Sequence, residues 1–185
     1  MRARQGHFRL ESGYHSDSWL ELDQLFRRPA ALAPYVTALA AKVATHQPDV
    51  VCGPFSGGAF LAQVIARELG LEFVFAQRIV SDRSGLFPVD YRLPSALRDA
   101  VHGRRIAVID DAISAGSAVR STLTDLDALG AQVVALAALM IIGDRPAALA
   151  RERKLSLEWL VHLPNSVWAP GECPMCALGG PLIDP

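Results

Sequence analysis

Residues 106–120 read Ile-Ala-Val-Ile-Asp-Asp-Ala-Ile-Ser-Ala-Gly-Ser-Ala-Val-Arg. The apolar run Ile106–Ile109 predicts a buried strand, and two carboxylates, Asp110 and Asp111, follow it directly. A loop of small residues comes next over 114–117, and a helical pattern begins after it. This arrangement predicts a site for a phosphorylated sugar, because backbone N–H groups and the positive end of the helix dipole face an anion there.

The side chains of this stretch suit the same ligand. Ser114 and Ser117 can donate hydroxyl hydrogen bonds to a phosphate. Asp110 and Asp111 can accept hydrogen bonds from sugar hydroxyls or help to hold a divalent metal. The alternative is an ordinary strand-to-helix turn with a serine N-cap. We favour the phosphate site, because the alternative leaves both aspartates without a task.

The stretch resembles the phosphoribosyl-diphosphate (PRPP) motif of type I phosphoribosyltransferases, in the form found in orotate phosphoribosyltransferases. The resemblance implies that the acidic pair binds the ribose 2- and 3-hydroxyls and that the loop binds the 5-phosphate. The residues it assigns to PRPP are Asp110, Asp111, Ala112, Ile113, Ser114, Ala115, Gly116, Ser117 and Ala118. Threonine is usual in the family at Ser114 and frequent at Ser117, and serine keeps the hydroxyl.

Strand and helix patterns alternate along the chain. Apolar runs predict strands at Asp49–Gly53, Glu72–Ala76, Arg105–Ile109, Val133–Ile142 and Leu155–Leu160. Helices are expected over 32–43, 60–69, 119–129 and 145–153. The alternation predicts an α/β fold with a mostly parallel central sheet, helices on both faces, and ligands beyond the carboxyl ends of the strands. We expect one domain over 1–185, with a hood segment at 1–28, an α/β core at 29–162 and a C-terminal tail at 163–185.

Bulk properties narrow the choice of partners. Eighteen basic and nineteen acidic residues give a formal net charge of −1, so there is no electrostatic reason to expect nucleic acid or a membrane surface as partner. The apolar run Val133–Ile142 is too short to span a membrane. No apolar segment follows Met1–Arg4, so we expect no signal peptide and a cytoplasmic location. The content of 51% hydrophobic residues suits buried strands and a subunit interface.

A second candidate anion loop follows the 49–53 strand. The segment Gly53-Pro54-Phe55-Ser56-Gly57-Gly58-Ala59 leads directly into a helix. Glycines at a helix start let an anion touch the backbone, although such turns often serve only close packing. In the family that the chain resembles, a similar loop binds the pyrophosphate of PRPP, which assigns Ser56, Gly57 and Gly58 to that role.

The amino-terminal segment predicts a small β-hairpin. Residues 6–20 alternate apolar and polar side chains in two short stretches around Ser12-Gly13. The segment looks like the hood of orotate phosphoribosyltransferases, whose pattern is Gly-x-Phe-x-Leu-x-Ser-Gly-x-x-Ser and which covers the base. Trp19 stands where the family often has an aromatic residue, and its ring could stack on a pyrimidine.

Asp144 and Arg145 follow the 133–142 strand. A guanidinium at the carboxyl end of a strand could bind a carboxylate through two hydrogen bonds. The alternative is a helix-starting aspartate beside a solvated arginine. Orotate enzymes carry an Asp-Arg pair at the matching place, which implies that Arg145 holds the orotate carboxylate. The expected base site is therefore Arg145, Trp19 and Ser114.

The chain departs from the family over residues 77–94. Many orotate enzymes have a mobile loop here with a Lys-x-His-Gly centre, whereas this stretch contains neither lysine nor histidine. Arg78 matches the first residue of that loop, and we expect it to act in catalysis with Asp110 and Asp111. Arg83 and Arg92 could supply further positive charge. The loop over 80–93 is long for a compact domain and lies beside the site, which suggests a closing lid.

The tail contains two cysteines at metal-ligand spacing, Cys173 and Cys176. Two thiols are half of the four ligands that a structural zinc site needs. We interpret the segment as a packed tail without a metal, and the alternative is a site completed by His162 or shared across a dimer. Cys52 lies in an apolar strand and is expected in the core, and three cysteines do not make a disulfide framework.

The resemblance implies displacement of pyrophosphate from PRPP by a nitrogen of a base. Orotate is the expected base and orotidine 5'-monophosphate the product, as in pyrimidine nucleotide biosynthesis. Mg²⁺ is the expected cofactor, held through PRPP and by Asp110 and Asp111, and the expected assembly is a homodimer. One alternative is a phosphoribosyltransferase for a purine or an unusual heterocycle. The other is a non-catalytic PRPP-binding regulator, but the sequence shows neither a basic face nor a DNA-binding domain.

Overall fold

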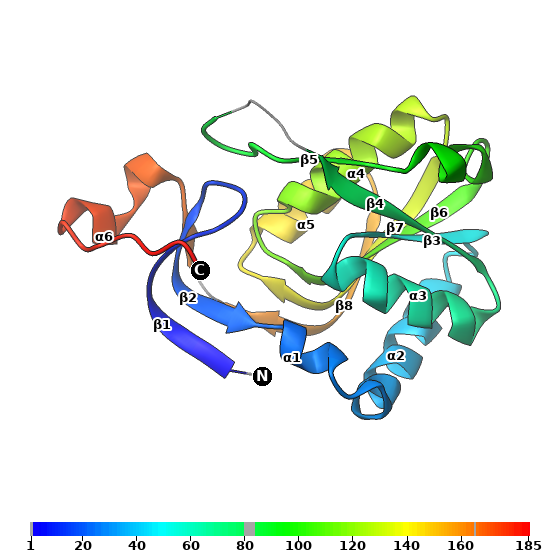
Figure 1. The fold of residues 1–185 in the computed structure, drawn as a ribbon, viewed down its shortest axis with the longest axis horizontal. Coiled ribbons are helices and arrows are strands. Elements are labelled where there is room, and N and C mark those ends of the chain that lie inside the picture. Colours follow the sequence, from blue (N-terminus) through cyan, green and yellow to red (C-terminus); the bar gives the residue numbers. More distant parts are fainter. Residues whose placement is uncertain (1, 80–83, 165) are drawn as a thin grey trace.

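The protein folds into a large sheet between two layers of helices, with a smaller sheet at one end (Figure 1). This computed structural model describes residues 2–79, 84–164 and 166–185. The large sheet has the strand order β5-β4-β3-β6-β7-β8. Its strands are β3 (Val50–Pro54), β4 (Glu72–Ile79), β5 (Asp90–Arg92), β6 (Arg105–Ile113), β7 (Gln132–Ile142) and β8 (Ser156–Leu163). Every pairing is parallel except that of β4 with β5, which confirms the predicted fold class.

The helices cover both faces of this sheet. Alternate strand residues point to opposite faces, so Val51 and Ala107 pack under one pair of helices while Cys52 and Val108 pack under the other. The first pair is α2 (Pro29–Ala44) and α3 (Gly57–Leu69), and the second is α4 (Ser117–Ala128) and α5 (Arg145–Arg153). Cys52 is fully buried, which confirms its predicted place in the core.

Local sequence signals account for the helix limits. The buried residues of α2 include Leu32, Val36, Leu39 and Val43, which is the predicted stripe. Pro29 stands at the first turn of α2, where its missing N–H costs nothing. Gly70 ends α3 with φ at +68°, a left-handed conformation that glycine adopts without a steric penalty. The predicted helices are confirmed, including α5 over its full predicted range.

Strand β6 is longer than the sequence predicted. The apolar pattern ends at Ile109, but the strand runs through both aspartates to Ile113. The reason is that β7 extends equally far and offers backbone partners throughout, with Asp110 opposite Ala138 and Ile113 opposite Ile141. The acidic pair therefore lies within a paired strand instead of beyond its end, and the strand fixes its backbone.

The loop predicted over 80–93 is too long at its carboxyl end, because residues 90–92 form strand β5. Strand β4 continues to Ile79 and pairs with β5, with Arg78 opposite Tyr91. Side chains of α4 bind the other edge of β5: the Tyr91 N–H donates to Ser121 Oγ over 2.6 Å and the Leu93 N–H to Asp125 Oδ2 over 2.8 Å. Ser121 and Asp125 thus accept hydrogen bonds from this edge of the chain, and the sequence alone did not indicate these partners. Residues 80–83, which include Arg83, lie outside the described residues.

The predicted hairpin forms the smaller sheet. Strands β1 (Arg2–Arg9) and β2 (His15–Glu21) pair antiparallel, and β9 (Val167–Trp168) of the tail pairs with β2. The tail then returns along β1, where the Arg9 N–H donates to the Ile183 carbonyl over 2.9 Å. We call this three-stranded sheet the hood. It lies beyond the carboxyl ends of the parallel strands, and short helix α1 (Asp23–Phe26) connects it to α2 (Figure 1).

The tail brings its cysteines to the hood and not to His162. After β9 come the short helices η2 (Pro170–Glu172) and α6 (Pro174–Ala177), which lie against the hood. The side chains grouped with Cys173 and Cys176 are His7 and His15. His162 lies on β8 and is exposed. The alternative in which His162 completes a cysteine site is therefore wrong, because the tail pairs with β2 and leaves β8.

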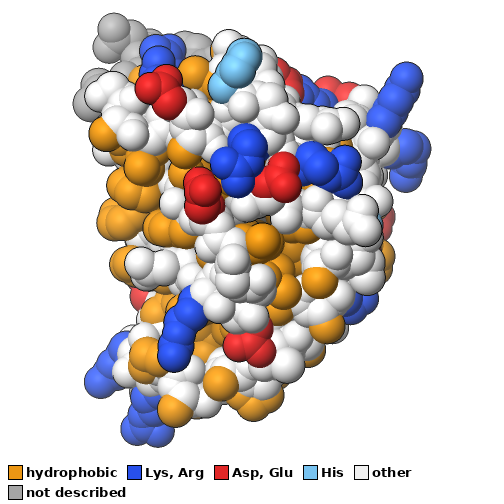
Figure 2. All heavy atoms as spheres, turned by 90° about the vertical axis from the view of Figure 1, so that its right-hand side faces the viewer, with side chains coloured by type: hydrophobic (Ala, Val, Ile, Leu, Met, Phe, Trp, Pro, Cys, Tyr) orange, Lys and Arg blue, Asp and Glu red, His pale blue; other side chains and the backbone are white. Residues whose placement is uncertain are grey.

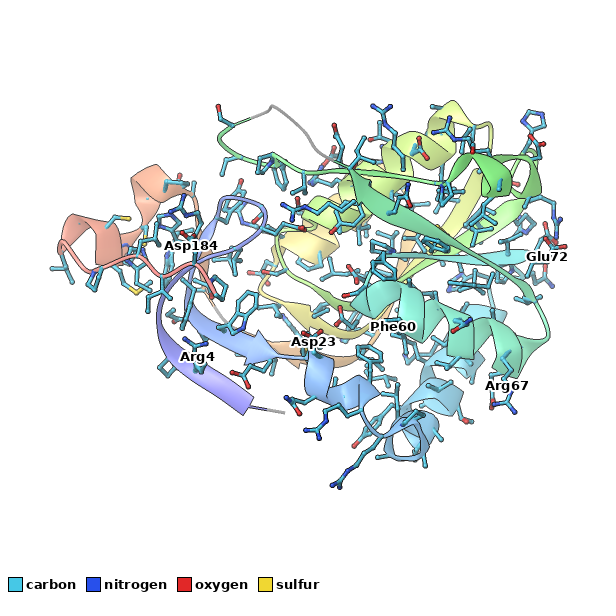
Figure 3. All side chains as sticks on the ribbon, viewed as in Figure 1. Arg4, Asp23, Phe60, Arg67, Glu72 and Asp184 are labelled. Carbon is cyan, nitrogen blue, oxygen red and sulfur yellow. The ribbon has the colours of Figure 1, made fainter. Side chains whose placement is uncertain are left out.

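The surface at the amino ends of β3 and β4 carries charges of both signs. Figure 2 shows this end of the molecule, with basic and acidic side chains next to one another. Arg104 lies 3.8 Å from Asp49 and 3.6 Å from Glu72, which Figure 3 labels at the same end. The remaining short helix, η1 (Ser95–Ala100), precedes β6. Among the described residues, no helix has both the length and the apolar character needed to cross a membrane.

Candidate functional site

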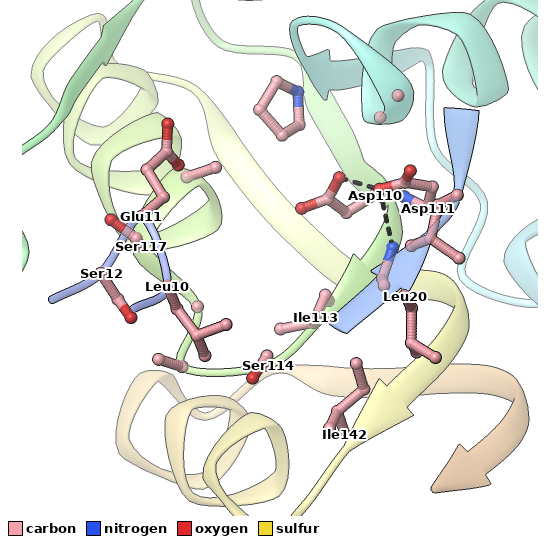
Figure 4. Close-up of a pocket in the computed structure, with 18 of the residues that line it drawn as sticks. Leu10, Glu11, Ser12, Leu20, Asp110, Asp111, Ile113, Ser114, Ser117 and Ile142 are labelled. Carbon is pink, nitrogen blue, oxygen red and sulfur yellow. Dashed lines mark hydrogen bonds between the residues drawn. The ribbon is translucent and has the colours of Figure 1, made fainter. Parts of the chain in front are cut away.

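A pocket of about 710 Å³ separates the hood from the carboxyl ends of the parallel strands (Figure 4). This volume is typical of a small-molecule site. The pocket walls come from the hood, from α1, from the loops that precede α3 and α4, and from β5 and β7. The lining residues that carry the argument are Glu11, Ser12, Trp19, Ser56, Gly57, Gly58, Tyr91, Asp110, Asp111, Ser114, Ser117 and Ile142.

The structure brings most of the predicted site residues into this pocket. Residues 56–58 and residues 110–118, all assigned to PRPP by the sequence, line it together with Trp19. Arg78 and Arg145 do not belong to its lining. Two loops that are far apart in the sequence therefore meet at one place, as expected for loops that follow neighbouring parallel strands.

The acidic pair is held in a fixed geometry by its own backbone. The Asp111 N–H donates to Asp110 Oδ1 over 3.0 Å, and the Ala112 N–H donates to Asp111 Oδ1 over 2.8 Å (Figure 4). Burial, and next the negative charge of Asp111, raise the pKa of Asp110 well above its ordinary value. Burial also raises the pKa of Asp111. Two buried carboxylates in contact favour a ligand that brings hydroxyl donors or positive charge.

The start of α3 is packed directly against these carboxylates. A Cβ atom at Gly57 would lie 2.2 Å from Asp111 Oδ2, and one at Gly58 would lie 2.6 Å from Asp110 Oδ1. Both distances are shorter than any van der Waals contact, so a larger residue at either position would displace the carboxylate or the helix start. The two glycines thus have a task beyond letting an anion approach the backbone: they make room for the acidic pair.

The loop before α4 presents two hydroxyls without partners. Gly116 has φ at +80° and forms the N-cap of α4, so the chain turns sharply into the helix. Within the described part of the chain, the buried hydroxyls of Ser114 and Ser117 have no hydrogen-bond partner. Unsatisfied buried hydroxyls are costly, and here they stand at a helix N-terminus that attracts anions. This combination suits a phosphate group.

Arg78 reaches the pocket through a hood residue. Its Nε atom lies 3.4 Å from Glu11 Oε1, and the hydroxyl of Tyr91 donates to the same oxygen over 3.0 Å. Glu11 of the hood thus pairs with a cation on β4. Sequence reasoning did not identify Tyr91, whose burial in β5 became visible only with the pairing of β4 and β5.

Arg145 is the first residue of α5 and lies against the hood turn. Its guanidinium carbon is 4.0 Å from the centre of the Tyr14 ring, and Nη1 donates to the Tyr14 hydroxyl over 3.2 Å. A cation over an aromatic face is attracted by the ring's negative charge. Tyr14 therefore positions Arg145 at the boundary between the hood and α5, a contact that no sequence pattern indicated.

Trp19 of the hood is among the residues that line the pocket, and its ring centre lies 6.4 Å from that of Phe8. Ser16 and Ser18 also line it. These two serines share one face of β2, so the alternation that predicted the strand could have indicated them.

Comparison with known proteins places the chain among transferases of phosphoribosyl groups. Residues 21–173 match the family model described as the phosphoribosyl transferase domain. An orotate phosphoribosyltransferase of Heliobacterium modesticaldum is 33% identical over 186 residues, covering 98% of this chain and 89% of the relative. Another, of Caldanaerobacter subterraneus subsp. tengcongensis, is 29% identical over 184 residues, covering 98% and 88%.

Solved structures agree on the fold. Orotate phosphoribosyltransferase from Aeropyrum pernix has a TM-score of 0.67 at 18% identity, covering 87% of this chain and 88% of that one. Adenine phosphoribosyltransferase from Thermoanaerobacter pseudethanolicus has a TM-score of 0.63 at 16% identity, covering 79% and 88%. The likeness to both shows a shared fold and does not distinguish one base from another. With a family match over most of its length and the acidic pair and loops in place, the chain belongs to the phosphoribosyl transferase domain family.

Proposed function

We propose that the protein transfers ribose 5-phosphate from PRPP to orotate, forming orotidine 5'-monophosphate and pyrophosphate. The observation that carries the PRPP assignment is the meeting of a buried acidic pair, the α3 start and two unpartnered hydroxyls in one pocket. The choice of orotate rests on relatives that bear this name and align with 98% of the chain.

Each part of PRPP has a matching surface in the pocket. The loop 114–118 receives the 5-phosphate, because the Ser114 and Ser117 hydroxyls and the α4 N-terminus can donate to its oxygens. The segment 56–58 at the α3 N-terminus receives the pyrophosphate. Asp110 and Asp111 lie between the two loops and accept hydrogen bonds from the ribose hydroxyls.

The same groups lower the barrier of the reaction. Displacement at the anomeric carbon passes through a sugar with developing positive charge, and the carboxylates of Asp110 and Asp111 stabilise that charge. Holding both ends of PRPP fixes the sugar for attack by the base nitrogen. Arg78, next to Glu11 at the pocket edge, supplies positive charge for the leaving pyrophosphate.

The residues of the site fit Mg²⁺. The ion prefers oxygen ligands, and Asp110 and Asp111 offer carboxylate oxygens whose charged forms are disfavoured by burial. When bound, Mg²⁺ would neutralise charge on the pyrophosphate and orient it.

The base site lies between the hood and α5. Trp19 provides a flat apolar surface for a pyrimidine ring, and Ser114 can hydrogen-bond to the base. Arg145, held by Tyr14, is the proposed partner of the orotate carboxylate. A base without a carboxylate would leave this guanidinium without its partner.

The second candidate function is transfer to another base. It is favoured by the lack of lysine over 77–94. A panel of orotate, uracil, adenine and hypoxanthine, each with PRPP and Mg²⁺, distinguishes the two through release of pyrophosphate. Of the four bases, we expect only orotate to give a high rate of pyrophosphate release. Faster release with a purine would reject orotate as the substrate.

We further propose a homodimer. Phe55 and Phe60 are 50% and 45% exposed, and their ring centres are 5.7 Å apart at the start of α3. Figure 3 shows Phe60 next to α1, where Phe26 packs on it at 5.7 Å. Exposed aromatic clusters are typical of interfaces. We also propose a cytoplasmic location, where the three free cysteines would stay reduced.

A further inference from the structure

Four metal-ligating side chains meet behind the hood, outside the pocket described above. They are His7 on β1, His15 on β2, and Cys173 and Cys176 of the tail. Their ligand atoms all lie within 4.8 Å of one another. The four residues come from both ends of the chain, so neither end could form the group alone.

The separations match those of a tetrahedral metal site. The His7 Nε2 and His15 Nδ1 atoms are 3.0 Å apart, and Cys173 Sγ is 3.4 Å from His7 Nε2. Cys176 Sγ is 3.6 Å from His7 Nε2 and 3.2 Å from His15 Nδ1. Zinc bonds of about 2.05 Å to nitrogen and about 2.3 Å to sulfur place tetrahedral ligands about 3.3–3.8 Å apart. The observed separations therefore lie at or slightly below those of a zinc site.

A backbone contact fixes His7 in the form that binds a metal. Its Nδ1 atom lies 3.1 Å from the Gly180 carbonyl oxygen, which can only accept, so Nδ1 carries the proton. The lone pair of the neutral ring is then on Nε2, the atom that faces His15 and both thiols. Metal-bound histidines commonly have this kind of second partner, which sets the ring orientation.

Burial indicates a structural site. His7, His15 and Cys173 are 6%, 5% and 3% exposed, whereas Cys176 is exposed and offers a route for the ion. The four side chains would fill all four positions of a tetrahedron, which leaves no position for water or substrate. Catalytic zinc sites keep such a position open, and structural sites close it.

We propose that these four residues bind one Zn²⁺ ion that clamps the C-terminal tail to the hood. Two thiolates and two imidazoles in a tetrahedron favour zinc among the common divalent ions. The proposed zinc site is linked to the substrate pocket along β2, because Ser16 follows His15 directly and lines that pocket. The inference does not depend on which base the protein uses.

The first test measures the metal itself. Protein purified without chelator is analysed for zinc by mass spectrometry, and apoprotein is titrated with Co²⁺. We expect one zinc ion per chain and the intense visible bands of tetrahedral Co²⁺ with thiolate ligands. Protein that holds no zinc after exposure to Zn²⁺, or Co²⁺ spectra typical of octahedral coordination, would overturn the proposal. A Cys173–Cys176 disulfide that persists in reducing buffer would overturn it as well.

Variants identify the ligands. Cys176→Ser changes an exposed side chain and should lower zinc affinity at least tenfold, and Cys173→Ser/Cys176→Ser should remove zinc. His162→Ala is the matched control, because it removes an exposed histidine outside the cluster and should keep a full zinc content. Zinc retained by the double variant, or lost by the control, would contradict the assignment.

Hydrogen exchange on the wild-type chain tests the clamp without any substitution. Zinc removal by chelator should speed amide exchange in the hood strands and in residues 166–185, while β6 and β7 stay protected. Addition of Zn²⁺ should restore the protection. Equal exchange with and without zinc would reject the clamp even if zinc binds.

Discussion

Replacement of Gly57 by alanine tests whether the acidic pair and the α3 start form one site. The added Cβ would lie 2.2 Å from Asp111 Oδ2, about 1.2 Å short of the 3.4 Å at which ordinary contact begins. Either the carboxylate or the helix start must move by that amount. A misplacement of about 1 Å costs about 100-fold in rate, so kcat/KM should fall about 100-fold, or about 2.7 kcal/mol.

The fold itself should tolerate this change. Gly57 does not have a positive φ, so alanine can adopt its backbone conformation, and alanine is the better helix former. Kinetics with PRPP and orotate, combined with thermal unfolding, separate the two effects. Gly171→Ala is the matched control, since a Cβ there has open space around it and should leave the kinetics unchanged.

A combined substitution identifies the clash as the cause. In the background of Asp111→Ala the oxygen that meets the new Cβ is absent, so Gly57→Ala should cost little further PRPP affinity. Wild-type PRPP affinity and kcat in a folded Gly57→Ala variant would refute the geometry on which the site rests. So would a full additional loss in the combined variant, because residues in contact should not act additively.

Three further predictions concern the acidic pair, the base site and the dimer interface. Asp110→Asn should gain in melting temperature relative to wild type as pH rises from 3.8 to the raised pKa of Asp110, because over this range the unfolded carboxyl loses its proton while the folded one keeps it, and the wild-type protein loses about 1.4 kcal/mol per unit of pKa difference. A difference between the two proteins that does not change with pH would contradict this. Arg145→Ala should raise the KM for orotate at least tenfold and far more than the KM for PRPP, with Arg151→Ala on the same helix as control; equal changes in both KM values would remove the carboxylate anchor. Light scattering should show a dimer that Phe60→Glu converts to monomer, and a wild-type monomer at all concentrations would reject the interface.

The sequence predicted the layered α/β architecture because its strands are apolar runs separated by clear helical stripes. The segment 145–153 could be placed correctly from Asp144, Pro146 and the apolar spacing that follows. The meeting of the segments 56–58 and 110–118 in one pocket was also predictable, because loops that follow neighbouring parallel strands lie at the same edge of the sheet.

Features that depend on pairing between distant segments could not be predicted. Strand β6 passes through Asp110 because β7 supplies partners there, and β5 forms because α4 provides Ser121 and Asp125 as acceptors. The same holds for the cysteine cluster. The spacing of Cys173 and Cys176 was visible, but only the return of the tail to the hood brings His7 and His15 beside them.

Calorimetric titration of PRPP into the protein, with and without Mg²⁺, tests the central claim most directly. The wild-type chain should bind one PRPP, more tightly when Mg²⁺ is present. Asp110→Asn/Asp111→Asn should lose at least 100-fold in affinity while remaining folded, because an amide cannot replace a carboxylate as acceptor for the ribose hydroxyls. Unchanged PRPP affinity in that folded double variant would contradict the account.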